Sequence, residues 1–386
     1  MMKRTRTMSY NPSFKEERDM TAQASIPSHV YLNLSIINSD VGDATSITPQ
    51  QAVFSEMRNT PIIENAADYE MSVVRFSANG IGRLLPLYVP VMKTLDETIY
   101  SVTVSGFAGA SPVQVYLKWR PEFQNAVKPY SPNDLTSFYY YGRTYTHFCG
   151  LFNDALWAAL NVGVPVDPTA STWNVLRYIP GSSLFELHLP ASFFWGAGGA
   201  VPSKYLYFNN PLGLLLANFP VLVQNTLQNA SGMEYLLDTR GLATTTVTQD
   251  FPSTGDVWSP IDTYVFTSST LPLIVEQGTA PIVVGTDNTG TGQGQSVQSG
   301  FQSILTDFVP GVSGGAEDAI TSIVYTPTSE YRMVSPSSTG PVQRIDVALW
   351  WRYRLTGALI PVYLPSMASL SMKILFRARW WHSGQT

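Results

Sequence analysis

Hydrophobic and polar side chains alternate with a period of two along most of the chain from about residue 28 onwards. This period is typical of strands with one buried and one exposed face. The clearest cases are residues 100–105, 113–119, 345–354 and 372–377. Less regular strands are predicted at 29–36, 69–77, 84–91, 183–189, 204–208, 261–267, 271–276 and 320–326. One flat sheet rarely holds so many strands, so we predict an all-β protein with two packed sheets.

A different pattern marks two short helices between the strands. Apolar side chains recur every three or four positions over about 145–162, from Phe148 to Ala159, and Gly163 and Pro165 follow. This spacing predicts a helix with one buried face. A second, shorter helix is predicted over 211–219, with Pro211 in its first turn.

Two further segments lack the apolar residues of a core. Residues 1–24 are polar and rich in charge, and we predict a separate N-terminal arm there. Residues 285–300 consist almost entirely of Gly, Thr, Gln and Ser, which is typical of a mobile, exposed loop. The remaining chain, 25–386, is predicted to be a single domain.

The composition is unusually poor in charge. Only 13% of the 386 residues are charged, about half the usual share, while 12% are aromatic and 44% are hydrophobic. That hydrophobic content excludes wholesale disorder. The charge deficit falls mainly on Lys, with 7 Lys against 16 Arg. Lys is depleted and Arg and aromatic residues are enriched at protein interfaces, so the composition favours surfaces that become covered.

Charge and cysteine content exclude several classes of protein. A net charge of −5 argues against a dedicated nucleic-acid binder, whose affinity comes mostly from neutralising phosphates. The longest apolar run, 212–223, is interrupted by Asn218 and Pro220 and is too short to span a bilayer. The one cysteine, Cys149, permits neither an internal disulfide nor a paired-cysteine metal site. A reducing compartment is therefore expected.

No catalytic or metal-binding motif is found in the sequence. The four histidines lack metal-ligand spacing, and neither a nucleophile elbow nor a phosphate-binding loop occurs. We therefore predict no catalytic residue, no metal ligand and no cofactor. A carbohydrate-binding or carbohydrate-cleaving β-sandwich stays open, because two carboxylates beside tryptophans would suit it. The candidates are Glu70, Glu186, Glu276, Asp262, Asp307 and Asp346, with Trp119, Trp350, Trp351, Trp380 and Trp381.

A series of short motifs, in order along residues 55–380, resembles one family of viral proteins. The motifs are NTP (59–61), YEMSVVRF (69–76), LPLYVP (85–90), YTHF (145–148), LFNDAL (151–156), YFN (207–209), ILTDF (304–308), EYR (330–332), IDVALWW (345–351), GALIP (357–361) and MKILFR (372–377). The family is the penton, or minor capsid, protein of virophages, polinton-like viruses and related small double-stranded DNA viruses. No single motif is diagnostic, and the resemblance rests on their order and coverage.

This resemblance implies a fold and a function. The fold would be a single jelly-roll β-sandwich of two four-stranded antiparallel sheets with short helical insertions. The function would be structural: homopentamers at the fivefold vertices of an icosahedral virion, docked into the major capsid protein after assembly inside the host cell. Within the same class, a single jelly-roll major capsid protein is the alternative.

The resemblance also suggests which residues contact partners. Trp350 and Leu375 are apolar residues on the polar face of their strands, which would fit a subunit interface or, equally, a position beneath an inserted loop. Lys3, Arg4 and Arg6 on the N-terminal arm would contact other minor capsid proteins, the shell or the genome, unless the arm is merely a solvated terminus.

Overall fold

The structure is a computed structural model that describes most of the chain. The described residues are 27–39, 50–81, 84–106, 111–122, 126–135, 137–161, 174–195, 200–224, 234–240, 242, 245–253, 258–273, 276–278, 300–309, 322–327 and 333–379. The predicted N-terminal arm, with Lys3, Arg4 and Arg6, lies outside these residues, as do positions 285–299 of the predicted loop.

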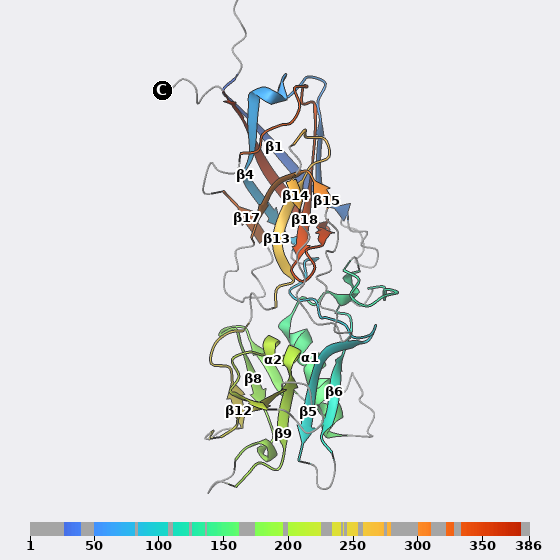
Figure 1. Ribbon diagram of the computed structural model, residues 1–386, viewed down its shortest axis with the longest axis vertical. Helices are drawn as coiled ribbons and strands as arrows, with labels where there is room; N and C mark the ends of the chain where they lie inside the picture. Colours follow the sequence, from blue (N-terminus) through green and yellow to red (C-terminus); the bar gives the residue numbers. More distant parts are fainter. Residues whose placement is uncertain are drawn as a thin grey trace, which may run out of the picture.

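Two packed sheets form a β-sandwich at the top of the view in Figure 1. The first sheet has the order β1-β21-β4-β17 and the second the order β16-β13-β18-β19, with β3 also paired to β18. All of these pairings are antiparallel. The strands are β1 (His29–Ile37), β3 (Val53–Met57), β4 (Tyr69–Asn79), β13 (Ile261–Thr267), β16 (Ile304–Phe308), β17 (Ser322–Tyr325), β18 (Arg344–Tyr353), β19 (Leu359–Pro361) and β21 (Ser369–Ala378).

Alternation along the strands builds the core of the sandwich. In β21 every second residue from Leu370 to Ala378 is buried, and in β18 every second residue from Ile345 to Tyr353. These side chains join those of β4 and β13 in one hydrophobic cluster between the sheets. The period-two pattern therefore correctly identifies the inward faces of both strands. Two short ribbons accompany the sandwich: β2 (Gln50–Gln51) pairs with β20 (Tyr363–Leu364), and β14 (Glu276–Gly278) with β15 (Gly300–Gln302).

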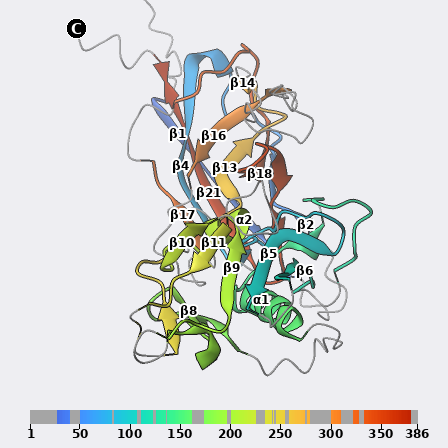
Figure 2. The same ribbon diagram turned by 60° about the horizontal axis from the view of Figure 1, so that its bottom comes forward.

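The chain between β4 and β13 forms a second body, which we call the insertion lobe (described residues from 84 to 260). It lies below the sandwich in Figure 1. A five-stranded sheet has the order β10-β11-β9-β5-β6, and a three-stranded sheet the order β12-β8-β7. Figure 2 shows the five-stranded sheet from the front, with α1 beside β5 and β6. The strands are β5 (Glu97–Ser105), β6 (Val113–Lys118), β7 (Leu176–Ile179), β8 (Leu184–His188), β9 (Tyr205–Asn209), β10 (Val221–Gln224), β11 (Glu234–Leu237) and β12 (Thr246–Thr248).

Both α-helices of the described chain lie in the insertion lobe, close to the positions that the sequence predicts. Helix α1 (Tyr145–Leu160) begins where the side chain of Thr144 accepts a hydrogen bond from the N–H of His147 (3.1 Å). Helix α2 (Asn210–Leu215) is capped in the same way by Asn209 and is shorter than the predicted 211–219. Three short 3-10 helices are η1 (Ala66–Asp68), η3 (Phe138–Tyr140) and η4 (Ala191–Phe193).

The insertion lobe has its own hydrophobic core. The apolar face of α1 packs with the inner side chains of β5, β8 and β9 in a cluster separate from that of the sandwich. The sequence predicts a single domain over 25–386, and within that range the strands β5 and β6 pack in this second cluster. Alternation shows that one face of a strand is buried, but not which core it faces.

The predicted strand over 84–91 is absent from the described chain, and of the predicted strand over 271–276 only Glu276 lies in a strand among the described residues. Residues 84–91 form no strand, and Tyr88 makes only an isolated bridge to Gly142. Pro86 and Pro90 have no N–H to donate to a ladder, so this apolar segment runs through the core as irregular chain.

Tyr88 is the centre of an aromatic cluster in the second core. Its ring makes edge contacts with Trp119, Phe148 and Trp258. Its hydroxyl is hydrogen-bonded to Nδ1 of His147 (2.5 Å), and Nε2 of His147 is hydrogen-bonded to the carbonyl of Arg120 (2.8 Å). Burial lowers the pKa of His147. The neutral imidazole therefore serves as a structural link between α1 and the chain after β6.

Replacing Gly142 by Ala should destabilise the protein. A β-carbon at Gly142 would overlap ring carbons of Tyr88, so the ring would have to move. Overpacking of this kind costs about 1–3 kcal/mol of unfolding free energy. Gly181→Ala is the matched control, because a β-carbon there meets nothing within 4 Å. Urea denaturation of both variants tests the prediction, and equal midpoints would contradict it.

Candidate functional site

The outer face of the first sheet carries one of the predicted contact residues. Leu375 on β21 lies directly opposite Tyr31 on β1 and Ser72 on β4. Leu375 is half-buried, whereas Tyr31 is 53% exposed. The ammonium of Lys373 lies 4.5 Å from the centre of the Tyr31 ring. An apolar side chain is thus presented within a largely polar face.

The outer face of the second sheet carries the other predicted contact residue, Trp350. Trp350 on β18 lies opposite Val265 on β13 and Pro361 on β19. Its indole N–H donates a hydrogen bond to the hydroxyl of Thr267 (2.8 Å), which fixes the orientation of the ring. Trp350 is also half-buried. The structure therefore places the two residues on opposite outer faces of the sandwich, and neither is fully covered by the rest of the chain.

Asp346, which is four residues before Trp350 and on the same outer face, anchors the turn after β13. Its Oδ1 accepts hydrogen bonds from the hydroxyl of Ser268 (2.9 Å) and from the N–H and hydroxyl of Thr270 (2.8 and 2.6 Å). Its Oδ2 accepts one from the hydroxyl of Ser269 (2.5 Å). Burial acts to raise the pKa of Asp346, but these donors outweigh it and lower the pKa to about 2. The carboxylate is a structural acceptor and not a proton donor.

Two of the other candidate carboxylates, Glu70 and Glu186, each have an ionisable partner of their own. Glu70 lies 3.4 Å from the guanidinium of Arg377, and Glu186 lies 3.1 Å from His188 in the insertion lobe. Trp119 and Trp351 are buried in different cores, and Trp380 and Trp381 lie outside the described residues. Glu70 and Glu186 therefore lie in different lobes and do not share one site.

The described ranges contain no group of three or more His, Cys, Asp or Glu side chains placed to hold a metal ion. They also contain no helix that is both long and apolar enough to cross a membrane.

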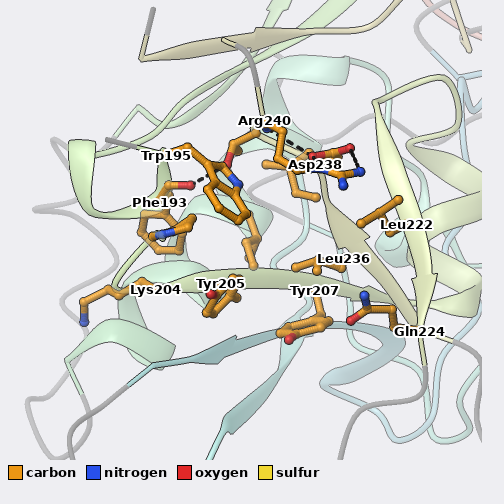
Figure 3. A pocket seen from close by; sticks show the side chains of 14 residues that line it. Phe193, Trp195, Lys204, Tyr205, Tyr207, Leu222, Gln224, Leu236, Asp238 and Arg240 are labelled. Carbon is orange, nitrogen blue, oxygen red and sulfur yellow. Dashed lines mark hydrogen bonds and ion pairs between the residues drawn. The ribbon is translucent and has the colours of Figure 1, made fainter. Parts of the chain in front are cut away.

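A pocket of about 390 Å³ lies on the insertion lobe (Figure 3). Its floor is the face of the five-stranded sheet that points away from the second core. Tyr205 and Tyr207 of β9 lie there, since Leu206 and Phe208 between and after them point into the core. In Figure 3, Trp195 and the ion pair of Asp238 with Arg240 lie across the pocket from the two tyrosines. The other lining residues are Phe193, Pro202, Lys204, Leu206, Leu222, Gln224, Leu236, Leu237 and Thr239.

This pocket was missed in the sequence analysis. Its residues come from four separate segments between Phe193 and Arg240, and no spacing in the sequence joins them. The one local signal is the alternation of Tyr205 and Tyr207 with Leu206 and Phe208, which predicts an aromatic outer face but not a hollow.

Comparison with known proteins identifies the family. The family model described as "Sputnik minor capsid protein V18/19" matches residues 30–378, which include strands of both lobes. The chain belongs to the Sputnik minor capsid protein V18/19 family. The resemblance drawn from the motifs is thereby confirmed.

Individual relatives agree with this assignment. The uncharacterized protein V18 of the Sputnik virophage is 31% identical over 131 residues, which cover 31% of this chain and 77% of that protein. A chain in the 3.5 Å cryo-EM structure of the Sputnik virophage has a TM-score of 0.71 at 23% identity, over 92% of this chain and 99% of that one. The mavirus penton protein has a TM-score of 0.66 at 16% identity, over 91% and 100%.

Membership of the Sputnik minor capsid protein V18/19 family establishes the broad class. The chain is a capsid protein of a virion, a structural protein and not an enzyme. This excludes the carbohydrate-cleaving alternative. As a capsid protein it functions in contact with other capsid proteins, so its outer faces are the surfaces of functional interest.

Substitutions of Asp346 test how strongly its carboxylate stabilises the turn after β13. In Asp346→Asn, the amide oxygen can replace Oδ1, but the charge and the Oδ2 acceptor are lost, so we expect a loss on the order of 1 kcal/mol of unfolding free energy. Asp346→Ala loses all of these acceptors and should be less stable than Asp346→Asn.

The contribution of Asp346 to stability should depend on pH, because folding lowers the pKa of its carboxyl group. The ionised form of Asp346 stabilises the protein above the unfolded value of about 4, and this contribution disappears as pH falls towards 2. The difference in unfolding free energy between wild type and Asp346→Asn, measured by urea denaturation, should therefore shrink as the pH falls from about 5 to about 2.5. A constant difference would contradict the assigned role.

Proposed function

We propose that the protein is a penton: a homopentamer that occupies the fivefold vertices of an icosahedral double-stranded DNA virus, surrounded by the major capsid protein. The observation that carries this proposal is the agreement in fold with the mavirus penton protein along the whole length of that chain. At 16% identity this agreement concerns the fold, and it supports the assembly state by analogy.

We also propose that the sandwich is a single jelly roll, and that the insertion lobe is a separate domain. Eight strands, counted in chain order, are β1, β3, β4, β13, β16, β17, β18 and β21. In this count the first sheet has the order 1-8-3-6 and the second the order 2-7-4-5. Two sheets of four strands with this interleaving are the arrangement of a jelly roll. The insertion lobe then lies between the third and fourth strands.

The two outer faces supply what a closed ring needs. In a cyclic pentamer one surface of each subunit contacts a different surface of the next. Trp350 and Leu375 lie on opposite faces of the sandwich and are both half-buried apolar side chains. We infer that these faces meet between neighbouring subunits. Few charges would then have to be desolvated, which fits the low charge content.

The N-terminal arm completes the proposal. Lys3, Arg4 and Arg6 would face the capsid interior and contact the shell, other minor capsid proteins or DNA. Their charge is suited to such contacts, although the chain as a whole is acidic.

Charged substitutions on the two faces should break the ring. We expect purified wild-type protein to have five times the mass of one chain in light scattering. Trp350→Arg and Leu375→Arg should each yield monomers, because a guanidinium at a subunit contact must lose its hydration without gaining a partner.

Phe251→Arg is the control for these variants. Phe251 is 70% exposed on the insertion lobe, outside both outer faces. This variant should stay pentameric, and all three should keep a thermal midpoint close to that of wild type. A wild-type protein that stays monomeric at high concentration, together with vertices lacking its density in a particle map, would refute the proposal.

Deletion of residues 1–24 should separate ring formation from docking. We expect the truncated protein to remain pentameric, since we assign the ring contacts to the outer faces of the sandwich, but to be recovered in purified particles at a small fraction of the wild-type level. Charge-reversal of Lys3, Arg4 and Arg6 to Glu should have the same effect. Normal recovery of both variants would contradict a docking role for the arm.

The alternative within the class is a single jelly-roll major capsid protein. It predicts that the chain is the most abundant protein of the particle, whereas a penton is a minor component. A stained gel of purified particles distinguishes the two.

A further inference from the structure

The pocket of the insertion lobe combines an aromatic surface with a rigid polar rim. Thr239, itself buried, donates a hydrogen bond from its hydroxyl to the carbonyl of Phe193 (2.7 Å), and the N–H of Lys204 donates to the carbonyl of Ser192 (3.0 Å). These bonds fix the segment that carries Trp195. The wall is therefore held in place without a ligand, which lowers the entropic cost of binding one.

The rim offers hydrogen-bond donors and acceptors side by side. Arg240 donates to both oxygens of Asp238 (2.9 and 2.7 Å), so the two side chains hold each other in one orientation. Hydrogen bonds from Arg240 lower the pKa of Asp238 and keep it ionised. Gln224 adds an amide, which both donates and accepts.

The charges of this rim cancel. The pair of Asp238 and Arg240 is neutral overall, and in Figure 3 the side chain of Lys204 points away from the other labelled residues. An anion would meet the carboxylate of Asp238, and a purely apolar ligand would remove both charged groups from water without giving them new partners. A neutral molecule rich in hydroxyl groups fits better.

We propose that this pocket binds a neutral saccharide. A sugar ring has one face of C–H bonds, whose partial positive charge is attracted to the negative face of an aromatic ring such as Tyr205, Tyr207 or Trp195. Its hydroxyls both donate and accept, as the rim requires. The volume of about 390 Å³ lies at the lower end of the range for small-molecule sites, which suits a short saccharide.

Saturation-transfer NMR on the full-length chain tests the proposal directly. The probes are the methyl glycosides of glucose, galactose, mannose and N-acetylglucosamine, with glucuronic acid as the charged comparison. We expect at least one neutral probe to receive saturation at its ring C–H protons, with a dissociation constant on the order of 1 mM.

Three variants locate the binding. Trp195→Ala and Arg240→Gln should each weaken it by about tenfold or more, through loss of a ring contact and of charge-assisted hydrogen bonds. Phe251→Ala is the control, since Phe251 is an exposed aromatic residue of the same lobe that does not line the pocket, and this variant should bind as wild type does. Because Arg240 is exposed, Arg240→Gln should fold normally even if Trp195→Ala does not.

The proposal does not depend on the pentamer, since every lining residue belongs to one chain. It is overturned if no neutral probe binds at 20 mM, taken as about twenty times the expected constant. It is also overturned if binding persists unchanged in Arg240→Gln, or if glucuronic acid binds more than about tenfold tighter than every neutral probe.

Discussion

Packing between the two sheets holds the sandwich together, and the contact between Phe76 and Phe266 is part of it. The two rings meet edge to face, with centroids 4.8 Å apart, and both side chains are fully buried. Phe76 is on β4 in the first sheet and Phe266 is on β13 in the second. These are the two strands between which the insertion lobe enters and leaves the fold. Inter-sheet packing thus brings the ends of a very long insertion together, and the closure entropy of such a loop grows only slowly with its length.

Little of this stability depends on charge. Two ion pairs of the described chain, Lys128 with Asp96 and Arg58 with Glu56, are largely exposed. Exposed pairs contribute about 0–1 kcal/mol each. The fold is stabilised instead by its two apolar and aromatic cores, so the surface is free to be poor in charge. That freedom is what a protein needs if it is to be enclosed by neighbouring subunits.

The sequence predicts individual elements better than it predicts their grouping. Helix α1 is found at 145–160 against a predicted 145–162, and β18 and β21 match their alternation residue by residue. The second core could not be inferred, because the burial of Val102 does not reveal whether it packs against a sheet or against α1. Short strands such as β7 and β12 contain too few residues for a period to be recognised. The pocket is harder to predict from the sequence, since Trp195 and Arg240 become neighbours only through the folding of the insertion lobe.

Because the two lobes have separate hydrophobic clusters, the pocket and the proposed ring contacts depend on different core residues. A substitution at Tyr207 perturbs a sheet that packs against α1, and the hydrophobic cluster of the sandwich contains neither Tyr207 nor Trp195. Conversely, Trp350 and Leu375 lie on strands whose inner faces belong to the sandwich core alone. The faces that we assign to the ring and the pocket on the insertion lobe can therefore vary independently, as effects at distant sites without shared partners usually add. On the assembly that we propose, the sandwich can keep its subunit contacts while the pocket on the insertion lobe changes.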